Sequence, residues 1–139
     1  MSFIPDFEDV EAANRLISPY VHRTPVLTSQ QLDAISGARL FFKCENFQKV
    51  GAFKFRGATN AVLNLMDGQR AAGVVTHSSG NHAAALAHAA VSRGVKAFIV
   101  MPSSAPEVKK RAVAGYGAEI TFCEPTLAAR EAAAAEVIE

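Results

Sequence analysis

From residue 73 onward, short continuous runs of hydrophobic residues alternate with segments in which hydrophobic residues recur every three or four positions. The continuous runs are typical of strands, and the spaced patterns are typical of amphipathic or buried helices. Repeated strand–helix units with short connections indicate an open parallel sheet with helices on both faces, so the predicted fold class is α/β. A nearly all-apolar run at 95–101 favours a strand that is buried on both faces. The predicted elements, strand and helix in turn, are 73–77, 82–92, 95–101, 106–114, 119–123 and 127–138.

The pattern before residue 73 is less regular. Ser29 is a favoured capping residue and predicts the start of a short helix. Asp67-Gly68 reads as the end of a longer helix, and a shift in composition at 68–73 marks an expected domain boundary between 1–72 and 73–139. The predicted elements are helices at 8–17, 30–35 and from 52 or 53 to about 66, and strands at 26–28 and 38–45, with 46–51 as a loop.

Composition narrows the classes of protein that fit this chain. Hydrophobic residues make up 50% and charged residues 19% of 139 residues, which excludes a disordered chain and predicts a sizeable core. Fourteen Lys and Arg against thirteen Asp and Glu give a net charge of +1, so the charge does not indicate binding to nucleic acid or to an anionic membrane. Two cysteines predict reduced thiols in a cytoplasmic protein. No apolar run reaches the roughly 20 residues that a membrane helix needs.

Lys54 is the first candidate for chemistry. It falls in the first turn of a predicted helix, where the dipole disfavours an ammonium. Burial against Phe53 and Phe55 would also favour the neutral amine, which is a nucleophile able to form a Schiff base with an aldehyde. The alternative is a solvated lysine, with Arg56 as a second surface charge.

The second candidate is the turn between the strand at 73–77 and the helix that follows. Exposed backbone amides at a helix start bind carboxylates or phosphates, and the side chains of Ser78, Ser79 and Asn81 add hydrogen bonds. The alternative is that these residues simply cap the helix. No metal site is expected, because the histidines here lack the i, i+4 spacing of a helical metal pair and no carboxylate lies among them.

Three segments together resemble the fold-type II pyridoxal-phosphate enzymes, the tryptophan synthase β-like group. They are FKCENFQKVGAFKFRGA at 42–58, THSSGNHAAALA at 76–87, and VMPSSAPEVKKRAVAGYGAEITFCEP at 100–125. The first resembles the lysine motif of that family, and the second resembles its next motif. Within the family, the sequence is most similar to serine racemases and serine/threonine dehydratases. The resemblance covers nearly the whole chain and implies pyridoxal 5'-phosphate as cofactor.

The resemblance implies a role for individual residues. Lys54 matches the lysine that holds the cofactor as a Schiff base, and Phe53 matches an aromatic residue beside the cofactor ring. Asn81 matches a residue that hydrogen-bonds the cofactor. Ser79 matches the second acid/base on the opposite face, as in racemases. The residues that match the loop binding the substrate carboxylate are Ser78, Ser79, Asn81 and His82.

The implied activity is a dehydratase, or ammonia-lyase, acting on L-serine, L-threonine or a similar β-hydroxy amino acid. The alternative within the family is an amino-acid racemase. Ala83 stands where racemases usually carry Gly, which slightly favours the dehydratases. The resemblance also implies a small amino-acid substrate and a homodimer.

Family members are more than twice as long, and their glycine-rich phosphate loop would lie beyond residue 139. The abrupt end in a helical stretch, EAAAAEVIE, adds to the expectation that this is an N-terminal portion. We therefore expect 1–72 to be the front of a large domain and 73–139 most of a small one. As an isolated chain it would be an inactive α/β fragment. A nucleotide-binding module is a further alternative, although no phosphate motif supports it.

Overall fold

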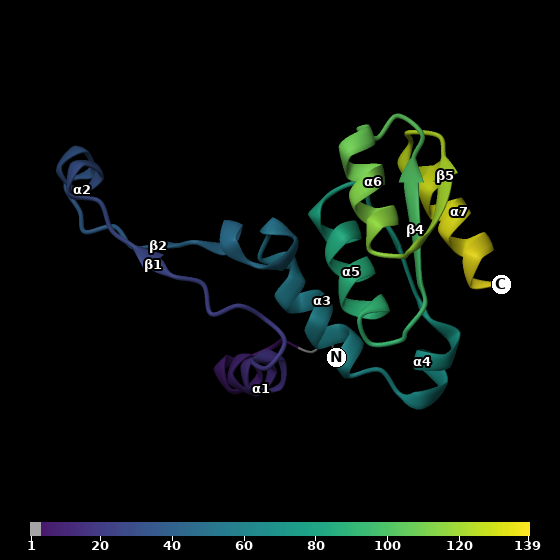
Figure 1. Ribbon diagram of the computed structural model, residues 1–139, viewed down its shortest axis with the longest axis horizontal. Coiled ribbons are helices and arrows are strands. Elements are labelled where there is room, and N and C mark those ends of the chain that lie inside the picture. The colour runs from purple at the N-terminus through teal and green to yellow at the C-terminus, as the bar shows by residue number, and fades with distance from the viewer. Residues whose placement is uncertain (1–3) are drawn as a thin grey trace.

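The computed structural model describes residues 4–139, which form a helix-covered sheet with an extended arm on one side (Figure 1). The sheet has three parallel strands in the order β3-β4-β5. The register places Thr76 beside Ile99 and Ile99 beside Ile120. The three strands are β3 (Val74–His77), β4 (Ala97–Pro102) and β5 (Glu119–Cys123).

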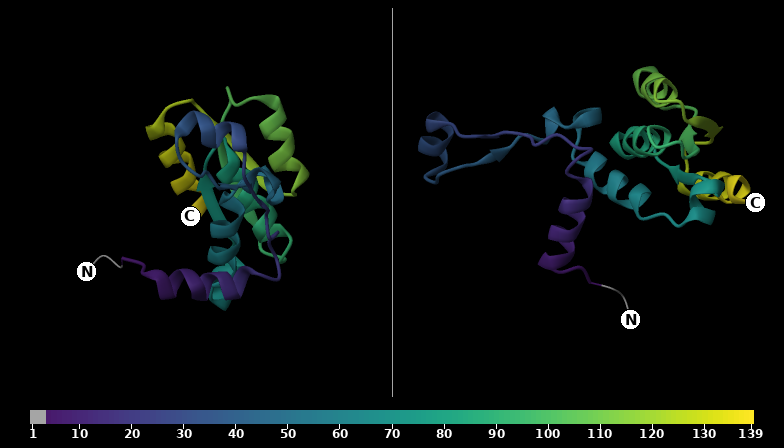
Figure 2. Two further views of the ribbon diagram at one scale, coloured as in Figure 1. Left: turned by 90° about the vertical axis from the view of Figure 1, so that its left-hand side faces the viewer. Right: turned by 60° about the horizontal axis from the view of Figure 1, so that its bottom comes forward.

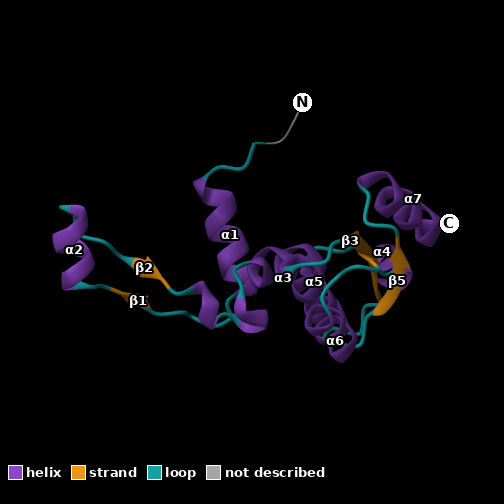
Figure 3. Cartoon of the chain, turned by 90° about the horizontal axis from the view of Figure 1, so that it is seen from above, coloured by secondary structure: helices purple, strands orange, loops and turns teal. Residues whose placement is uncertain are grey.

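Helices cover both faces of this sheet, as predicted. α5 and α6 lie on one face and α7 lies on the other, which is clearest from above (Figure 3). The central strand β4 is nearly all buried, because it has a neighbouring strand on each side and a helix over each face. The predicted α/β class and buried central strand are therefore confirmed. The helices are α5 (Asn81–Val91), α6 (Glu107–Gly115) and α7 (Leu127–Ile138).

The core is centred on α5, which packs against β4, α6 and α3 (Lys54–Leu63). All but one of the buried residues of α5 are alanine, and this small side chain lets neighbouring elements approach closely. A helix enclosed on several sides needs no polar stripe, which explains its apolar sequence. Phe55 and Val62 of α3 join the same hydrophobic cluster as Ile99 and Met101 of β4.

The region after α3 differs from the prediction of one helix to about residue 66. α3 ends at Leu63, and a separate helix, α4, spans Asp67–Ala72. Asp67 begins this helix instead of ending the previous one, because an acidic residue is favoured in a first helical turn. The Met66 N–H also donates to the Gln69 side chain at 3.0 Å, which fixes the start of α4.

The arm consists of two strands and a short helix that extend away from the sheet (Figure 2). Val26 pairs with Lys43 and Leu27 pairs with Phe42, antiparallel. The predicted strand at 38–45 is therefore wrong in extent, since only two of its residues pair. Two strands alone bury little surface, so pairing does not spread along the segment. The arm elements are β1 (Val26–Leu27), α2 (Gln30–Ser36) and β2 (Phe42–Lys43).

Two 3-10 turns join the arm to α3, where a loop was predicted. The predicted cap of α2 is confirmed, because the Ser29 hydroxyl accepts from the Leu32 N–H at 3.4 Å.

None of the helices described between residues 4 and 139 is both long and apolar enough to cross a membrane. The expected domain boundary at residue 73 stays a prediction. The remaining elements are α1 (Phe7–Ile17), η1 (Glu45–Phe47) and η2 (Lys49–Gly51).

Candidate active site

Lys54 is the first residue of α3, and its two neighbours determine where it points. Phe55 is 1% exposed and inserts into the core, whereas Phe53 is 60% exposed. Successive side chains turn by about 100° around a helix axis, so burial of Phe55 holds Lys54 at the edge of the core. Lys54 is itself exposed. The expectation that Lys54 is buried between the two phenylalanines is therefore wrong, because only one of them faces inward.

Lys54 lines a hollow of about 230 Å³. Its Nζ atom is 5.4 Å from the centre of the Phe53 ring. An added Cβ at Gly57 would meet no atom within 4 Å, so the surface one turn along the helix is open. The residues that line this hollow are Phe53, Lys54, Gly57, Ala58 and His82.

The loop between β3 and α5 supplies the other side of the site. The Ser78 N–H donates to the Val100 carbonyl at 3.0 Å, which continues the sheet pairing and holds the start of the loop. Gly80 is the N-cap of α5, and no side chain caps this helix. The Ser78 hydroxyl instead accepts from the Gly80 N–H at 3.3 Å. The alternative that these polar residues serve as helix caps is therefore wrong.

His82 links the two candidate segments. It lies in the first turn of α5 and reaches the hollow that contains Lys54. Burial of the ring away from water lowers the pKa of His82 below its ordinary value, and the positive charge of Lys54 lowers it further by a smaller amount. Both effects favour the uncharged imidazole beside the amine.

The predicted site residues do not all meet in one place. Asn81 faces a neighbouring hollow of about 170 Å³, which Gly80 and Tyr116 also line. Ser78 and Ser79 lie half-buried on the loop that leads to both hollows. Ala83 is fully buried, so its methyl group does not line the hollow beside Lys54. The bias toward dehydratases that we expected from this residue has no direct geometric basis.

The sequence pattern does not predict a polar cluster around Arg56, two residues after Lys54. Arg56 does not remain a free surface charge, because its Nε and Nη2 atoms donate to both carboxylate oxygens of Glu45, each at 2.8 Å. Thr24 donates to the same carboxylate at 2.5 Å. These hydrogen bonds, chiefly those from Arg56, lower the pKa of Glu45 to about 2. We call Thr24, Glu45 and Arg56 the Glu45 cluster.

The exposed groups of this site fit a cofactor that carries an aldehyde and a substrate that carries a carboxylate. Lys54 provides a primary amine for the aldehyde, and the Phe53 ring lies beside it. The first amides of α5 have no side-chain cap, so they are free to bind an anion. Between residues 4 and 139 no group of three or more His, Cys, Asp or Glu could hold a metal ion.

Comparisons with known proteins agree with this chemistry. The chain is 55% identical over 135 residues to beta-hydroxyaspartate dehydratase of Paracoccus denitrificans. The aligned region covers 97% of this chain and 43% of that protein. It is 53% identical over 137 residues to serine racemase of Arabidopsis thaliana, which covers 99% of this chain and 41% of that protein. The structure of maize serine racemase matches with a TM-score of 0.94 and 50% identity, covering 97% of this chain and 41% of that chain.

The chain thus spans about two fifths of the length of these relatives. A comparison with protein families matches residues 17–139 to the pyridoxal-phosphate dependent enzymes. The matched range includes Lys54, the β3–α5 loop and the whole sheet. This chain belongs to the pyridoxal-phosphate dependent enzyme family.

Proposed function

We propose that the full-length polypeptide containing this chain is a pyridoxal-phosphate-dependent dehydratase of a small β-hydroxy amino acid. The observation that carries the proposal is the exposed amine of Lys54, which shares a hollow with Phe53 and His82. Relatives named as beta-hydroxyaspartate dehydratase and serine racemase support a small amino acid as substrate. L-serine, L-threonine and 3-hydroxyaspartate all belong to this class.

The β3–α5 loop would bind the substrate carboxylate. The uncapped amides at the start of α5 and the positive end of its dipole attract an anion. The hydroxyls of Ser78 and Ser79 and the amide of Asn81 add hydrogen-bond donors. The lowered pKa of His82 favours its uncharged form, in which one ring N–H can donate a hydrogen bond.

Lys54 would act as the base. The bound cofactor supplies an electron sink for the negative charge left at Cα when a proton is removed. The Lys54 amine is placed at the open edge of α3, where it can accept that proton. The β-hydroxyl takes up a proton and leaves as water, which gives an enamine, and hydrolysis of this enamine by a second water releases a keto acid and ammonia.

Racemisation is a second candidate function, and Ser79 favours it. This hydroxyl comes from the β3–α5 loop, whereas the Lys54 amine comes from α3, so the two acid/base groups belong to separate elements. A proton removed by one group and returned by the other would invert Cα. The identities to a dehydratase and to a racemase, 55% and 53%, are too similar to separate the two activities.

Borohydride reduction of the full-length protein followed by peptide mapping tests the proposal. We expect a pyridoxyl label on Lys54, and no label there in Lys54→Ala. A keto acid formed from the L-amino acid indicates the dehydratase, and the D-amino acid indicates the racemase. A label on another lysine, with Lys54 unmodified, contradicts the proposed function.

We further propose that residues 1–139 alone retain no cofactor and that the full-length protein is a cytoplasmic homodimer. The matched relatives are more than twice as long, so most of their cofactor contacts have room to lie elsewhere. A visible cofactor band that survives dialysis of the 139-residue chain, and that Lys54→Ala abolishes, contradicts the first point. Sedimentation of the full-length protein tests the second.

A further inference from the structure

The Glu45 cluster ties the start of α3 to two separate segments of the chain. Arg56 holds Glu45, which begins the 3-10 turn η1. The Arg56 Nη2 atom also donates to the His22 carbonyl at 3.1 Å. Thr24 lies two residues further on, is 4% exposed, and donates to Glu45. One guanidinium therefore joins the segments at 22–24 and 45–47 to the helix that carries Lys54.

A second polar side chain reinforces the same connection. Gln48 is 3% exposed, and its amide donates to the His22 carbonyl at 2.9 Å. Its side-chain oxygen accepts from the His22 N–H at 2.9 Å and the Lys49 N–H at 3.0 Å. These bonds hold the chain just before Val50, which adopts a left-handed conformation with φ 57°. A β-branched residue rarely takes this conformation, so the surroundings must hold it there.

The hydrogen bonds of Arg56 help to fix the rotation of α3 about its axis, and therefore the direction of the Lys54 side chain. Phe55 inserts into the core, and Arg56 reaches back to Glu45 on another side of the helix. Two fixed directions about 100° apart prevent rotation of α3 about its own axis. The third direction, that of Lys54, then points to the hollow with His82. Without the Arg56 contact, Phe55 alone would have to set the rotation of this first turn.

We propose that Arg56, held by the Glu45 carboxylate to which Thr24 also donates, is the positioning residue that aims the Lys54 amine. This inference rests on the proposed function, because it assumes that Lys54 is the reactive lysine. The planar guanidinium makes two parallel hydrogen bonds to one carboxylate, a geometry that a lysine cannot reproduce. The required feature is therefore the shape of the group as well as its charge.

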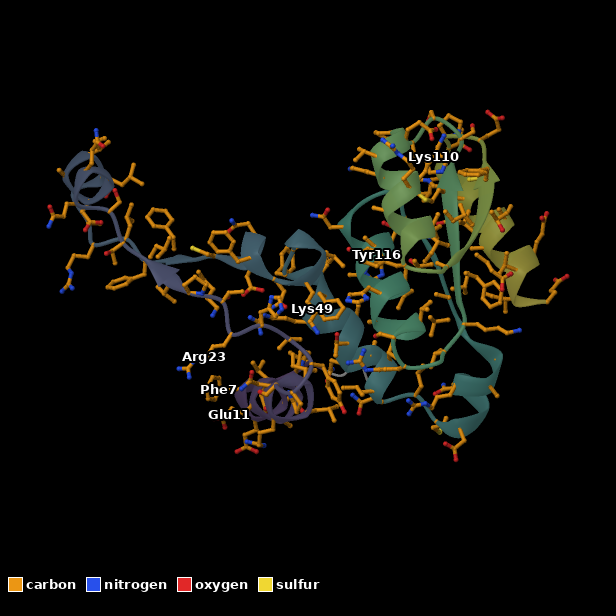
Figure 4. The ribbon with its side chains drawn as sticks, viewed as in Figure 1. Phe7, Glu11, Arg23, Lys49, Lys110 and Tyr116 are labelled. Atoms are coloured by element: carbon orange, nitrogen blue, oxygen red, sulfur yellow. The ribbon has the colours of Figure 1, made fainter. Side chains whose placement is uncertain are left out.

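Cofactor labelling of the full-length protein tests this role in Arg56→Lys and Glu45→Gln. The protein is incubated with pyridoxal phosphate, reduced with borohydride and mapped, and the label on Lys54 is compared with that on Lys49. Lys49 lies where the arm meets the body of the molecule (Figure 4). We expect both variants to lower the ratio of label on Lys54 to label on Lys49 by ~10-fold to ~100-fold, the cost of a misplacement near 1 Å.

The ratio separates positioning from simple stability. If the cluster only stabilises the fold, the variants lower the total yield of folded protein but leave the ratio unchanged, which overturns the proposal. The matched control is Glu107→Gln, which breaks the Lys110–Glu107 ion pair of 2.8 Å at the far end of α6 (Figure 4) and should leave the ratio unchanged. Wild-type protein without label on Lys54 would instead reject the proposed function.

Discussion

The two phenylalanines beside Lys54 give a direct test of how α3 packs. Phe55 is 1% exposed, and its ring stacks on His88 with centroids 5.1 Å apart. Removal of a buried Phe side chain costs about 3–5 kcal/mol through lost transfer free energy and the cavity that remains. Phe53 is 60% exposed, so its removal should change the free energy of unfolding by no more than about 0.5 kcal/mol. We therefore expect Phe55→Ala and Phe53→Ala to differ by about 3 kcal/mol.

Urea unfolding followed by circular dichroism at the helix band measures this difference. With a slope of about 1–2 kcal/mol per molar urea, the midpoints of the two variants should lie about 2 M apart. Phe55→Leu keeps most of the buried volume and should cost less than about 1.5 kcal/mol, so it remains measurable if Phe55→Ala does not fold. Equal losses at Phe53 and Phe55, or a larger loss at Phe53, would refute the rotation of α3 on which the aim of Lys54 depends.

Three further substitutions test other parts of the structure. Because Arg56 lowers the pKa of Glu45 from 4.5 to about 2, the pair stabilises the fold above pH 4.5 and loses this effect as the pH falls toward 2. Urea unfolding should show the advantage of wild type over Glu45→Gln shrinking by about 1–2 kcal/mol, allowing for solvent screening. Gly73→Ala should lower the free energy of unfolding in urea by about 1–3 kcal/mol, because φ is 100° and the new Cβ would lie 2.9 Å from the Lys96 carbonyl oxygen. Gly57→Ala should raise it by about 0.5–1 kcal/mol, and it should lower cofactor absorbance after dialysis of the full-length protein, since it fills space in the hollow.

The sheet and its helices were predictable because their signals are local. The apolar run of β4 and the alanine pattern of α5 each repeat over enough residues to specify one type of element. The arm was less predictable, because the extent of a strand depends on a partner. The segment at 38–45 has strand-forming residues throughout, yet only Phe42 and Lys43 pair with another strand. Asp67 was misread for a similar reason, since acidic residues occur both in turns and at helix starts.

The residues of the candidate site also differ in how far the sequence alone could predict them. Motifs on a single segment, at 54 and at 78–82, could be recognised from the order of residues alone. The Glu45 cluster could not, because Thr24, Glu45 and Arg56 lie on separate segments of the chain that meet only in the folded structure. Its one signal in the sequence is a pair of opposite charges, Glu45 and Arg56, on either side of a short loop. The direction of the Lys54 side chain also depends on which of the flanking residues, Phe53 or Phe55, enters the core. The sequence does not distinguish between these two phenylalanines.

The alanines of α5 have a consequence for the site as well as for the core. Lys54 belongs to α3 and His82 belongs to α5, so the separation of these helices sets the width of the hollow between the two side chains. All but one of the buried residues of α5 are alanine, which permits the close approach that lets the Phe55 ring stack on His88. A larger side chain there would move the helices apart and carry Lys54 away from His82. The close packing of α3 and α5 therefore also places Lys54 and His82 around one hollow.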